Sequence, residues 1–352
     1  MKVFAEGAPP THRTMNILSI ESSCDETSAA VVTMGAGERL IRSNIVASQI
    51  EIHRRFGGVV PEVAGRAHIE CVARITKEAL TEAQLGMEDV DAVAVTNTPG
   101  LIGALLVGVN FAKSLAFSYG KPLIPVNHIR GHIAAAYLAH PELEPPFLAM
   151  VASGGHTSII LVRDYTDFLE IGYTRDDAAG EAFDKAARVL GIPYPGGAEM
   201  DRLACDGDPT AIKLPSPAIP HVEGGAFEFS FSGLKTAVIN YVNTSKMRGE
   251  EINRADVAAS FTRTVCRAVS SHLASALEAT GSDKLVLAGG VAANSHLRRA
   301  LEKTANEHGA RFYVPPVSLC GDNGAMIGAQ AYYEYMSGVR AGTSLNARAT
   351  GE

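Results

Sequence analysis

Residues 147–162, FLAMVASGGHTSIILV, place a polar, glycine-rich turn between two apolar runs. Each run is apolar and has the length of a buried strand, so the stretch predicts two strands joined by a tight turn. The same arrangement occurs earlier in the chain, where Asn16–Ile20 and Ala29–Thr33 flank the polar turn Glu21–Thr27. Alternating strand-like and helix-like segments follow each strand–turn–strand, which predicts two successive α/β units.

The spacing of apolar residues predicts the remaining elements. We expect helices over residues 61–83, 101–119, 128–139, 178–190, 234–242, 254–280, 295–307 and 322–335. Further strands are expected over residues 91–96, 123–126 and 284–288, and one more strand should end near Tyr173. A proline-rich break at Pro141–Pro146 separates the two units. We therefore expect an extension over residues 1–15, an N-terminal lobe over 16–140, a C-terminal lobe over 147–320, and a closing helix over 321–337 that packs back on the first lobe.

The charge of the chain argues against a protein that binds nucleic acid through a broad basic surface. Its 352 residues include 31 Lys and Arg against 38 Asp and Glu, a net charge of −7. Nucleic-acid-binding proteins usually show a basic excess or stripe. The small basic clusters His53–Arg55 and Arg298–Arg299 are typical of solvated surface, so an RNA substrate would need a local patch or the help of a partner.

Cysteine usage and hydropathy favour a cytoplasmic protein. The five cysteines are far apart and form no CxxC pair, which fits neither a disulfide framework nor a cysteine zinc site. The first 14 residues lack the apolar core of a signal peptide. The most apolar stretch, Leu101–Phe117, contains Asn110 and Lys113 and is short for a membrane span of ~20 residues. We expect a buried helix there.

Three glycine pairs lie in turns where a phosphate group could bind. They occur in Ser153–Thr157, in Gly289–Asn294 and at Gly196–Gly197. A single pair is explained by the steric needs of a tight turn, but three pairs beside polar side chains favour a nucleotide site, because glycine lets backbone N–H groups approach a ligand. The GxGxxG and GxxxxGK[ST] patterns are absent, so a simple dehydrogenase and a Walker-type ATPase are both disfavoured.

Two histidines suggest a metal site. His128 and His132 are four residues apart, which places their imidazoles on one helix face, directly after a predicted strand end. Ile129 occupies the position where a zincin peptidase carries its catalytic glutamate, so proteolysis is disfavoured. A third ligand would be a carboxylate, and Asp322 at the start of the last helix could either bind a metal or cap that helix.

Eight sequence strings together resemble the tRNA N6-adenosine threonylcarbamoyltransferase family. In chain order they are GGVVPEVAGRAHIE (57–70), NTPGLIGALLVGVNFAKSLA (97–116), VNHIRGHIAAAY (126–137), SGGHTS (153–158), DDAAGEAFDKAARVLGIPYPGG (176–197), FSFSGLKTAV (229–238), GGVAANSHLR (289–298) and CGDNGAMIGAQ (320–330). The resemblance implies a two-lobed actin-like/Hsp70-like fold of the acetate kinase and sugar kinase group, with duplicated ribonuclease-H-like lobes. It also implies transfer of threonylcarbamoyl from threonylcarbamoyl-AMP to N6 of adenosine 37, in tRNAs that read codons beginning with A, with release of AMP.

The resemblance also implies the site residues and the partners. The metal ligands would be His128, His132 and Asp322, holding one divalent ion, Fe²⁺ or Zn²⁺. The residues that would bind the adenylate are Val151, Ala152, Ser153, Gly154, Gly155, Asp184, Gly197, Asp201 and Asn294. No catalytic residue is assigned; His156, Glu21, Asp25 and Glu26 are candidate bases by their position in polar turns. The partners of such a bacterial protein would be tRNA, a paralogous inactive subunit and a small P-loop ATPase, and no membrane.

Three other functions remain open at this point. A sugar- or acetate-kinase-like phosphotransferase would need a catalytic aspartate in a strand-end turn, for which Asp25 is a loose candidate. A non-catalytic nucleotide-binding scaffold would use the metal for stability, so that loss of His128 or Asp322 would unfold the protein. An endopeptidase is disfavoured by Ile129. Asp184 on its own would most simply form a helix-surface pair with Arg188, four residues later.

Overall fold

The computed structural model of the protein describes residues 14–221 and 224–350. Residues 1–13 of the expected extension lie outside the described residues, and Met15 is the first residue of strand β1 (Met15–Glu21). The contacts between residues divide the chain into two compact units. Unit 1 comprises the described residues of Met1–Ala47, Pro61–Ala134 and Asn323–Glu352, and unit 2 comprises those of Ser48–Val60 and Ala135–Asp322.

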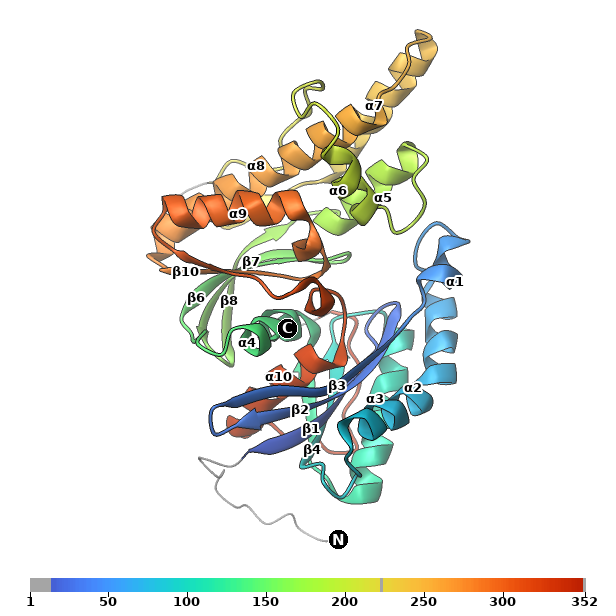
Figure 1. Ribbon diagram of the computed structural model, residues 1–352, viewed down its shortest axis with the longest axis vertical. Helices are drawn as coiled ribbons and strands as arrows, with labels where there is room; N and C mark the ends of the chain where they lie inside the picture. Colours follow the sequence, from blue (N-terminus) through green and yellow to red (C-terminus); the bar gives the residue numbers. More distant parts are fainter. Residues whose placement is uncertain (1–13, 222–223, 351–352) are drawn as a thin grey trace. The chain divides into compact units, whose positions relative to one another are not determined.

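Among the described residues, unit 1 contains a five-stranded sheet in the order β3-β2-β1-β4-β5 (Figure 1). Besides β1, its strands are β2 (Glu26–Gly35), β3 (Glu38–Ser48), β4 (Ala92–Thr98) and β5 (Leu123–Asn127). Strand β1 pairs antiparallel with β2, whereas β1, β4 and β5 run parallel to one another. The carboxyl ends of these three strands therefore meet at one edge of the sheet, which is where α/β folds collect their ligands.

Helices cover both faces of this sheet. They are α2 (Pro61–Ala83), α3 (Ile102–Tyr119) and α10 (Gly324–Met336), and the first part of α4 (His128–Ala139) packs against α10 through Gly131. Side chains alternate along β1, so Leu18 and Ile20 point to one face and Ser19 to the other. Leu18 and Ile20 pack in one cluster with Leu105 of α3, whereas the Ser19 hydroxyl donates to the carbonyl of Gly324 in α10 (2.7 Å). Helices α2 and α3 thus lie on one face and α10 on the other.

The chain beyond α10 returns along unit 1. Ala341 pairs with Leu123 at the start of β5, and Leu345 packs against the same apolar cluster as α3. Farther on, the Gly100 N–H donates to the carbonyl of Ala349 (3.1 Å). This final segment therefore packs against the loop between β4 and α3.

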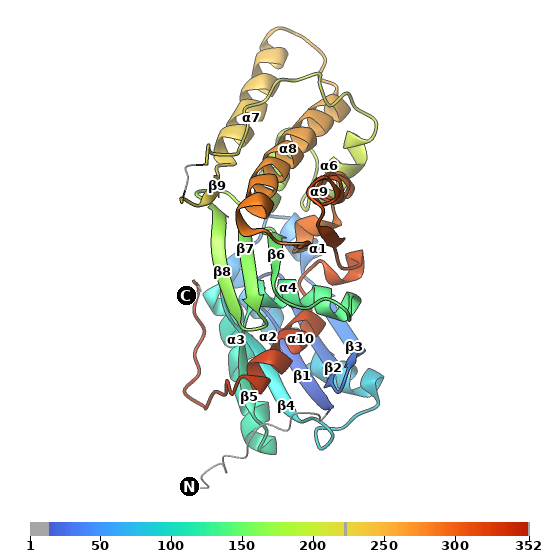
Figure 2. The same ribbon diagram turned by 90° about the vertical axis from the view of Figure 1, so that its left-hand side faces the viewer.

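Within the described part of unit 2, a six-stranded sheet has the order β11-β10-β6-β7-β8-β9 (Figure 2). Its strands are β6 (Phe147–Ala152), β7 (Thr157–Asp164), β8 (Asp167–Thr174), β9 (Phe227–Phe229), β10 (Lys284–Ala288) and β11 (Arg311–Tyr313). Strands β6, β7 and β8 are antiparallel neighbours, and β10 and β11 run parallel to β6. From β8 to β11 the order repeats that of unit 1, with β9 added beyond β8. The two sheets confirm the predicted two-lobed α/β fold with duplicated lobes.

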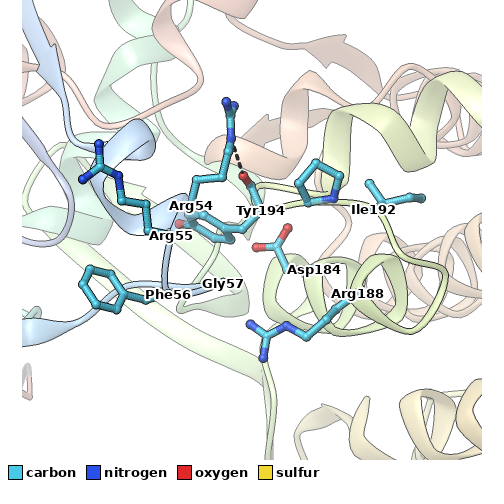
Figure 3. Close-up of a pocket in the computed structure, with 9 residues that line it drawn as sticks. Arg54, Arg55, Phe56, Gly57, Asp184, Arg188, Ile192 and Tyr194 are labelled. Atoms are coloured by element: carbon cyan, nitrogen blue, oxygen red, sulfur yellow. Dashed lines mark hydrogen bonds between the residues drawn. The ribbon is translucent and has the colours of Figure 1, made fainter.

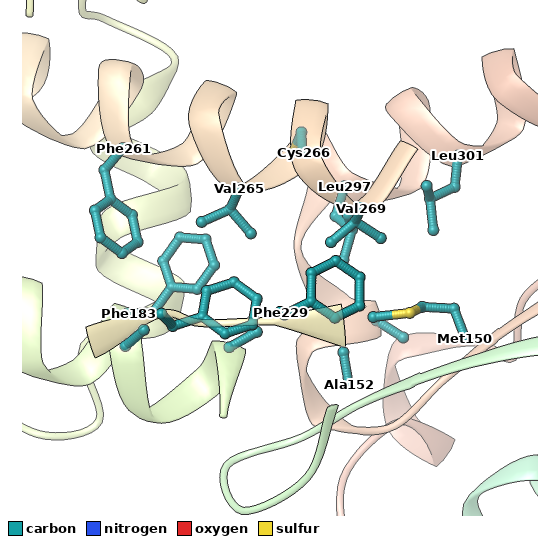
Figure 4. Packing of buried hydrophobic residues seen from close by; sticks show 14 of the residues in the cluster. Met150, Ala152, Phe183, Phe229, Phe261, Val265, Cys266, Val269, Leu297 and Leu301 are labelled. Atoms are coloured by element: carbon teal, nitrogen blue, oxygen red, sulfur yellow. The ribbon is translucent and has the colours of Figure 1, made fainter. Parts of the chain in front are cut away.

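The apolar core of unit 2 lies beneath its long helix α8 (Figure 4). The helices of this unit are α1 (Ile50–Arg54), α5 (Ala179–Val189), α6 (Gly197–Ala204), α7 (Ser232–Met247), α8 (Arg254–Thr280) and α9 (Ser295–Glu307), with 3-10 turns η1 (Gly290–Ala293) and η2 (Val317–Leu319). Asn253 starts α8 by accepting hydrogen bonds from two backbone N–H groups, and Gly281 ends it at a φ of 63°. Phe261, Val265 and Val269, at helical spacing, pack in one cluster with Phe229.

Helix α3 is long and apolar enough to cross a membrane by length and composition, but the helix packs on its own sheet. About 33% of its most apolar window is buried, on a face that includes Leu105, Val109 and Ala112. A core helix passes the same test of length and composition. The expected helix over this segment is therefore present, but only one of its faces is buried, and residues such as Phe117 are exposed.

We expect the replacement Phe261→Ala to lower the free energy of unfolding by about 3–5 kcal/mol, because the surrounding core cannot close the cavity. Urea unfolding followed by circular dichroism measures this loss. Phe117→Ala removes the same atoms from a side chain that is 77% exposed, and should cost less than about 0.5 kcal/mol. Similar losses in the two variants would contradict the described core.

Candidate functional site

The two histidines follow the end of a parallel strand, as predicted. Helix α4 begins at His128, directly after β5, and the Asn127 side chain accepts a hydrogen bond from the Ile129 N–H (2.9 Å) at the first turn. The rings of His128 and His132 lie edge to face, with centroids 4.5 Å apart. Both residues are buried. The strand end and the capped helix start thus place both imidazoles on one side of α4.

Asp322 completes a triad with these histidines. One ligand atom from each of His128, His132 and Asp322 lies within 4.8 Å of the others. Capping of α10, the other role considered for Asp322, is performed by the next residue, because the Asn323 side chain accepts from the Met326 N–H (3.0 Å). Two imidazoles and one carboxylate are a donor set that suits Fe²⁺ or Zn²⁺ and leaves coordination positions open. The residues therefore fit one divalent ion.

A buried carboxylate orients His128. Glu21, at the end of β1, has no exposed surface, and its Oε2 accepts a hydrogen bond from His128 Nδ1 (3.0 Å). The same carboxylate accepts hydrogen bonds from the Ser23 N–H and the Thr96 hydroxyl. Because Nδ1 is held by Glu21, Nε2 is the His128 atom available to a metal, which is the usual arrangement around metal-bound histidines.

Sequence reasoning had placed Glu21 among the candidate bases and had missed this contact. The position of Glu21 at a strand end was the feature of the sequence that could have indicated the contact. Glu21 ends β1, Thr96 lies near the end of β4, and His128 follows β5, and these three strands are parallel neighbours. Polar residues in these positions are expected to meet. The order of the strands in the sheet determines which of these side chains come into contact, and the sequence does not give that order.

The glycine turns of unit 2 gather around the end of β6. In the turn after β6, the Ser153 N–H donates to the carbonyl of His156 (2.8 Å), and Gly154 and Gly155 are exposed, with open space where a Cβ would be. Gly289, at a φ of 90°, passes so close to β6 that a Cβ would lie 2.4 Å from the carbonyl oxygen of Ala152. Glycine is therefore required at position 289 for steric reasons, whereas Gly154 and Gly155 leave their backbone accessible.

Helix α5 begins at the same place. The Gly180 N–H donates to the carbonyl of Ser153 (3.2 Å), and a Cβ on Gly180 would lie 2.5 Å from that oxygen. Residue Ala288 of β10 is paired with Val151 of β6. The segment Val151–Gly155 is thus brought together with the start of α5 and with the turn after β10.

The other predicted adenylate residues lie on α5 and α6 and at the start of α9 in unit 2. Asp184 of α5 accepts a hydrogen bond from the Gly196 N–H (2.7 Å), so the pair with Arg188 considered from the sequence is replaced by a contact that holds the turn before α6. Gly197 is the first residue of α6 and has open space at its Cβ position. Asn294 caps α9 by accepting from the Leu297 N–H (2.9 Å).

Asp201 of α6 is bound to the first turn of α9. One oxygen accepts from the Ser295 N–H (3.0 Å) and the other from His296 Nδ1 (2.7 Å). Burial on its own would raise the pKa of Asp201, but the hydrogen bonds from His296 and Ser295 outweigh it and hold this pKa below its ordinary value. The charged carboxylate therefore stabilises the junction of α6 and α9.

Comparison with known proteins identifies the same family by two routes. A family model described as tRNA N6-adenosine threonylcarbamoyltransferase matches residues 40–329. A protein with that name from Clostridium botulinum (strain 657 / Type Ba4) is 53% identical over 333 residues, which cover 95% of this chain and 96% of that protein. Another protein with the same name, from Moorella thermoacetica, is 54% identical over 332 residues, which cover 94% of this chain and 95% of that protein.

Two solved structures share the fold. Full-length HypF in the phosphate- and nucleotide-bound form has a TM-score of 0.60 at 16% identity, over 97% of this chain and 48% of that one. The HypF structure from T. kodakarensis has a TM-score of 0.62 at 14% identity, over 93% and 48%. At such identities the likeness concerns the fold alone, and it confirms the predicted actin-like class.

We expect Glu21→Gln to weaken divalent-metal binding by about 10–100-fold, because the amide no longer holds His128 Nδ1 as a charged acceptor does. Titration of the metal-free protein with Zn²⁺ and with Fe²⁺ measures this affinity. Glu62→Gln changes an exposed carboxylate of α2 and should leave the affinity unchanged. Wild-type affinity in Glu21→Gln would show that Glu21 does not orient a ligand.

The lowered pKa of Asp201 predicts a pH-dependent contribution to stability. A carboxylate with a depressed folded-state pKa stabilises the protein above its ordinary pKa of ~3.9, and this contribution disappears as the pH falls through the folded value. Asp201→Asn should therefore cost about 1–3 kcal/mol of unfolding free energy near pH 7, and this difference should shrink below about pH 4. Urea unfolding at several pH values measures it, with Asp206→Asn, at an exposed residue, as the control. A pH-independent difference would contradict the ionic role.

Proposed function

Since the chain belongs to the tRNA N6-adenosine threonylcarbamoyltransferase family, it is a transferase of tRNA modification, and we propose that it transfers threonylcarbamoyl from threonylcarbamoyl-AMP to N6 of adenosine 37. The tRNAs would be those that read codons beginning with A, and AMP would be released. The observation that carries the proposal is the triad His128, His132 and Asp322, whose ligand atoms lie within 4.8 Å of one another. Such a triad would add a catalytic metal centre to this fold.

The triad would hold one divalent ion, Fe²⁺ or Zn²⁺. When bound, this ion supplies a Lewis acid that polarises a carbonyl or phosphoryl oxygen. The chain itself contributes the geometry, because Glu21 fixes the ring of His128 and the helix spacing fixes His132 beside it. No carboxylate lies between the two histidines, where Ile129 stands, which supports a transferase over a peptidase.

The adenylate would bind at the glycine turns of unit 2. Gly154, Gly155 and Gly290 each have open space at the Cβ position, so their backbone N–H groups can approach a phosphate. Asp184, Gly197, Asp201 and Asn294 would complete the set near the ribose and base. The side chain that takes the proton from the adenosine amine is not assigned.

The proposal also covers the protein partners of the chain and its location in the cell. With a net charge of −7, the chain would share tRNA binding with a paralogous inactive subunit and a small P-loop ATPase. A cytoplasmic location is supported by the cysteines, since no disulfide joins any two of them within the described residues.

The proposal is tested with His132→Ala. Purified protein, partner subunits, threonylcarbamoyl-AMP and an unmodified tRNA with adenosine 37 are incubated, and nucleoside mass spectrometry detects the product. We expect product formation to fall at least about 100-fold together with the metal content, because the Lewis acid is lost, while the melting temperature stays close to that of the wild type.

The control is His308→Ala, which removes a half-buried histidine outside the triad and should keep both metal and activity. Full metal content in His132→Ala would refute the ligand assignment. An unfolded variant would favour the structural-metal scaffold. Absence of product from the wild-type protein with all partners present would refute the proposed reaction.

A further inference from the structure

A basic cavity of about 350 Å³ lies within unit 2, between the segment after α1 and the helix α5 with its following loop (Figure 3). Arg54–Gly57 line one side, and Asp184, Arg188 and Ile192–Tyr194 line the other. The lining therefore includes three arginines and one carboxylate, in a chain whose net charge is −7. This local excess of positive charge is the kind of patch that an anionic ligand requires.

Arg54 joins the two sides of the cavity. Its Nε donates to the carbonyl of Tyr194 (3.2 Å), and its Nη1 pairs with Glu51 of the same helix at 2.7 Å. Gly57 then turns the chain at a φ of 71°, in the left-handed region that glycine favours. Arg54 therefore has a positioning role, and the segment after α1 is held against the loop that precedes α6.

The other two arginines are available to a ligand. Arg55 and Arg188 are both exposed, and neither forms an ion pair with any residue that the structure describes. Arg188 lies against bare backbone, since a Cβ on Gly57 would be 3.4 Å from its Nη2. Guanidinium groups without a carboxylate partner suit phosphate oxygens, which they bind through two parallel N–H donors.

An aromatic ring lies beside these arginines. Phe56, between Arg55 and Gly57, is 58% exposed at the cavity. A single exposed apolar side chain needs no explanation by itself. An exposed ring next to unpaired guanidinium groups, however, is the combination with which proteins bind unpaired nucleotides, stacking on the base and neutralising the backbone.

We propose that this cavity docks the single-stranded loop of the tRNA substrate, with Arg55 and Arg188 on its phosphates and Phe56 stacked on an unpaired base. The inference rests on the proposed function for the identity of the RNA. It locates the local patch that a chain of net negative charge requires if it meets RNA directly. An acidic protein surface would satisfy the arginines but would give the exposed ring no stacking partner.

The test measures the Kd of the full chain for an unmodified tRNA transcript by fluorescence anisotropy. Salt is varied from about 50 to about 200 mM, a range over which counterion release changes affinity strongly. The double variant Arg55→Ala/Arg188→Ala should bind about tenfold more weakly and lower the salt slope by about 2, one per lost phosphate contact. Phe56→Ala should also bind about tenfold more weakly, with an unchanged slope, since stacking is not ionic.

Arg267→Ala is the matched control. Arg267 is an exposed arginine of α8 that does not line the cavity, so its removal should change neither the Kd nor the slope. Melting temperatures establish that all variants are folded. Binding of threonylcarbamoyl-AMP is measured in parallel and should be retained in every variant.

Each contrary result has a definite meaning. Unchanged tRNA affinity in the cavity variants, or no binding by the wild type at low salt, overturns the inference. Loss of adenylate binding alone would assign the cavity to the adenylate, and loss of a protein partner alone would assign it to that partner. If the variants bind tRNA more weakly but the wild type yields no modified nucleoside, the docking site is supported and the proposed reaction is refuted. If the wild type and the variants modify tRNA equally well, the proposed reaction is supported and the docking site is refuted.

Discussion

The buried carboxylate of Glu21 is the constraint around which unit 1 is arranged. A carboxylate without exposed surface is tolerated only when donors surround it, because desolvating an unpaired charge costs several kcal/mol. Its donors are the Ser23 N–H, the Thr96 hydroxyl and His128 Nδ1, which belong to the ends of β1, β4 and β5. The hydrogen bonds to this one carboxylate therefore fix three strand ends relative to one another. They also fix the imidazole of His128, which would bind the metal.

The duplicated sheets use the same position for two different purposes. In unit 1 the turn after the first strand is buried and polar, with Glu21 and Ser22 fully enclosed. In unit 2 the corresponding turn carries the exposed glycines Gly154 and Gly155. A buried network can orient a ligand residue but leaves no room for a substrate, whereas exposed backbone N–H groups can bind one. The repeat in topology is thus compatible with a division of roles between the two turns.

Sequence periodicity predicted the elements whose burial is regular, and failed where burial is irregular. Helices α2, α8 and α9 have the expected bounds because their apolar spacing follows the helical period. Strand β3 was not expected: its apolar residues are exposed or only partly buried, and within it Ser43 is the single buried residue. Such a strand forms because its neighbour β2 offers hydrogen bonds, and that information is not local to its own sequence.

The candidate site shows the same limit. The sequence alone predicted that His128 and His132 share a helix face, because their spacing is local. A carboxylate as the third ligand was expected on chemical grounds. The partner of His128 was not readable, because Glu21 lies 107 residues earlier in the chain. Likewise, Arg188 was the obvious local partner for Asp184, but the Gly196 N–H occupies that carboxylate instead. Local patterns therefore identify candidate ligands, and long-range hydrogen bonds decide how they are oriented.

The two carboxylates of the predicted adenylate set differ in what they can do. Both oxygens of Asp201 accept hydrogen bonds from the first turn of α9, through Ser295 and His296. A carboxylate engaged in this way acts on a ligand mainly by holding its neighbours in place. The neighbour here is Asn294, which caps α9 and follows the turn after β10. Asp201 would thus support the adenylate site by fixing Asn294, whereas Asp184 contributes by holding the turn before α6, through the hydrogen bond that its Oδ1 accepts from the Gly196 N–H.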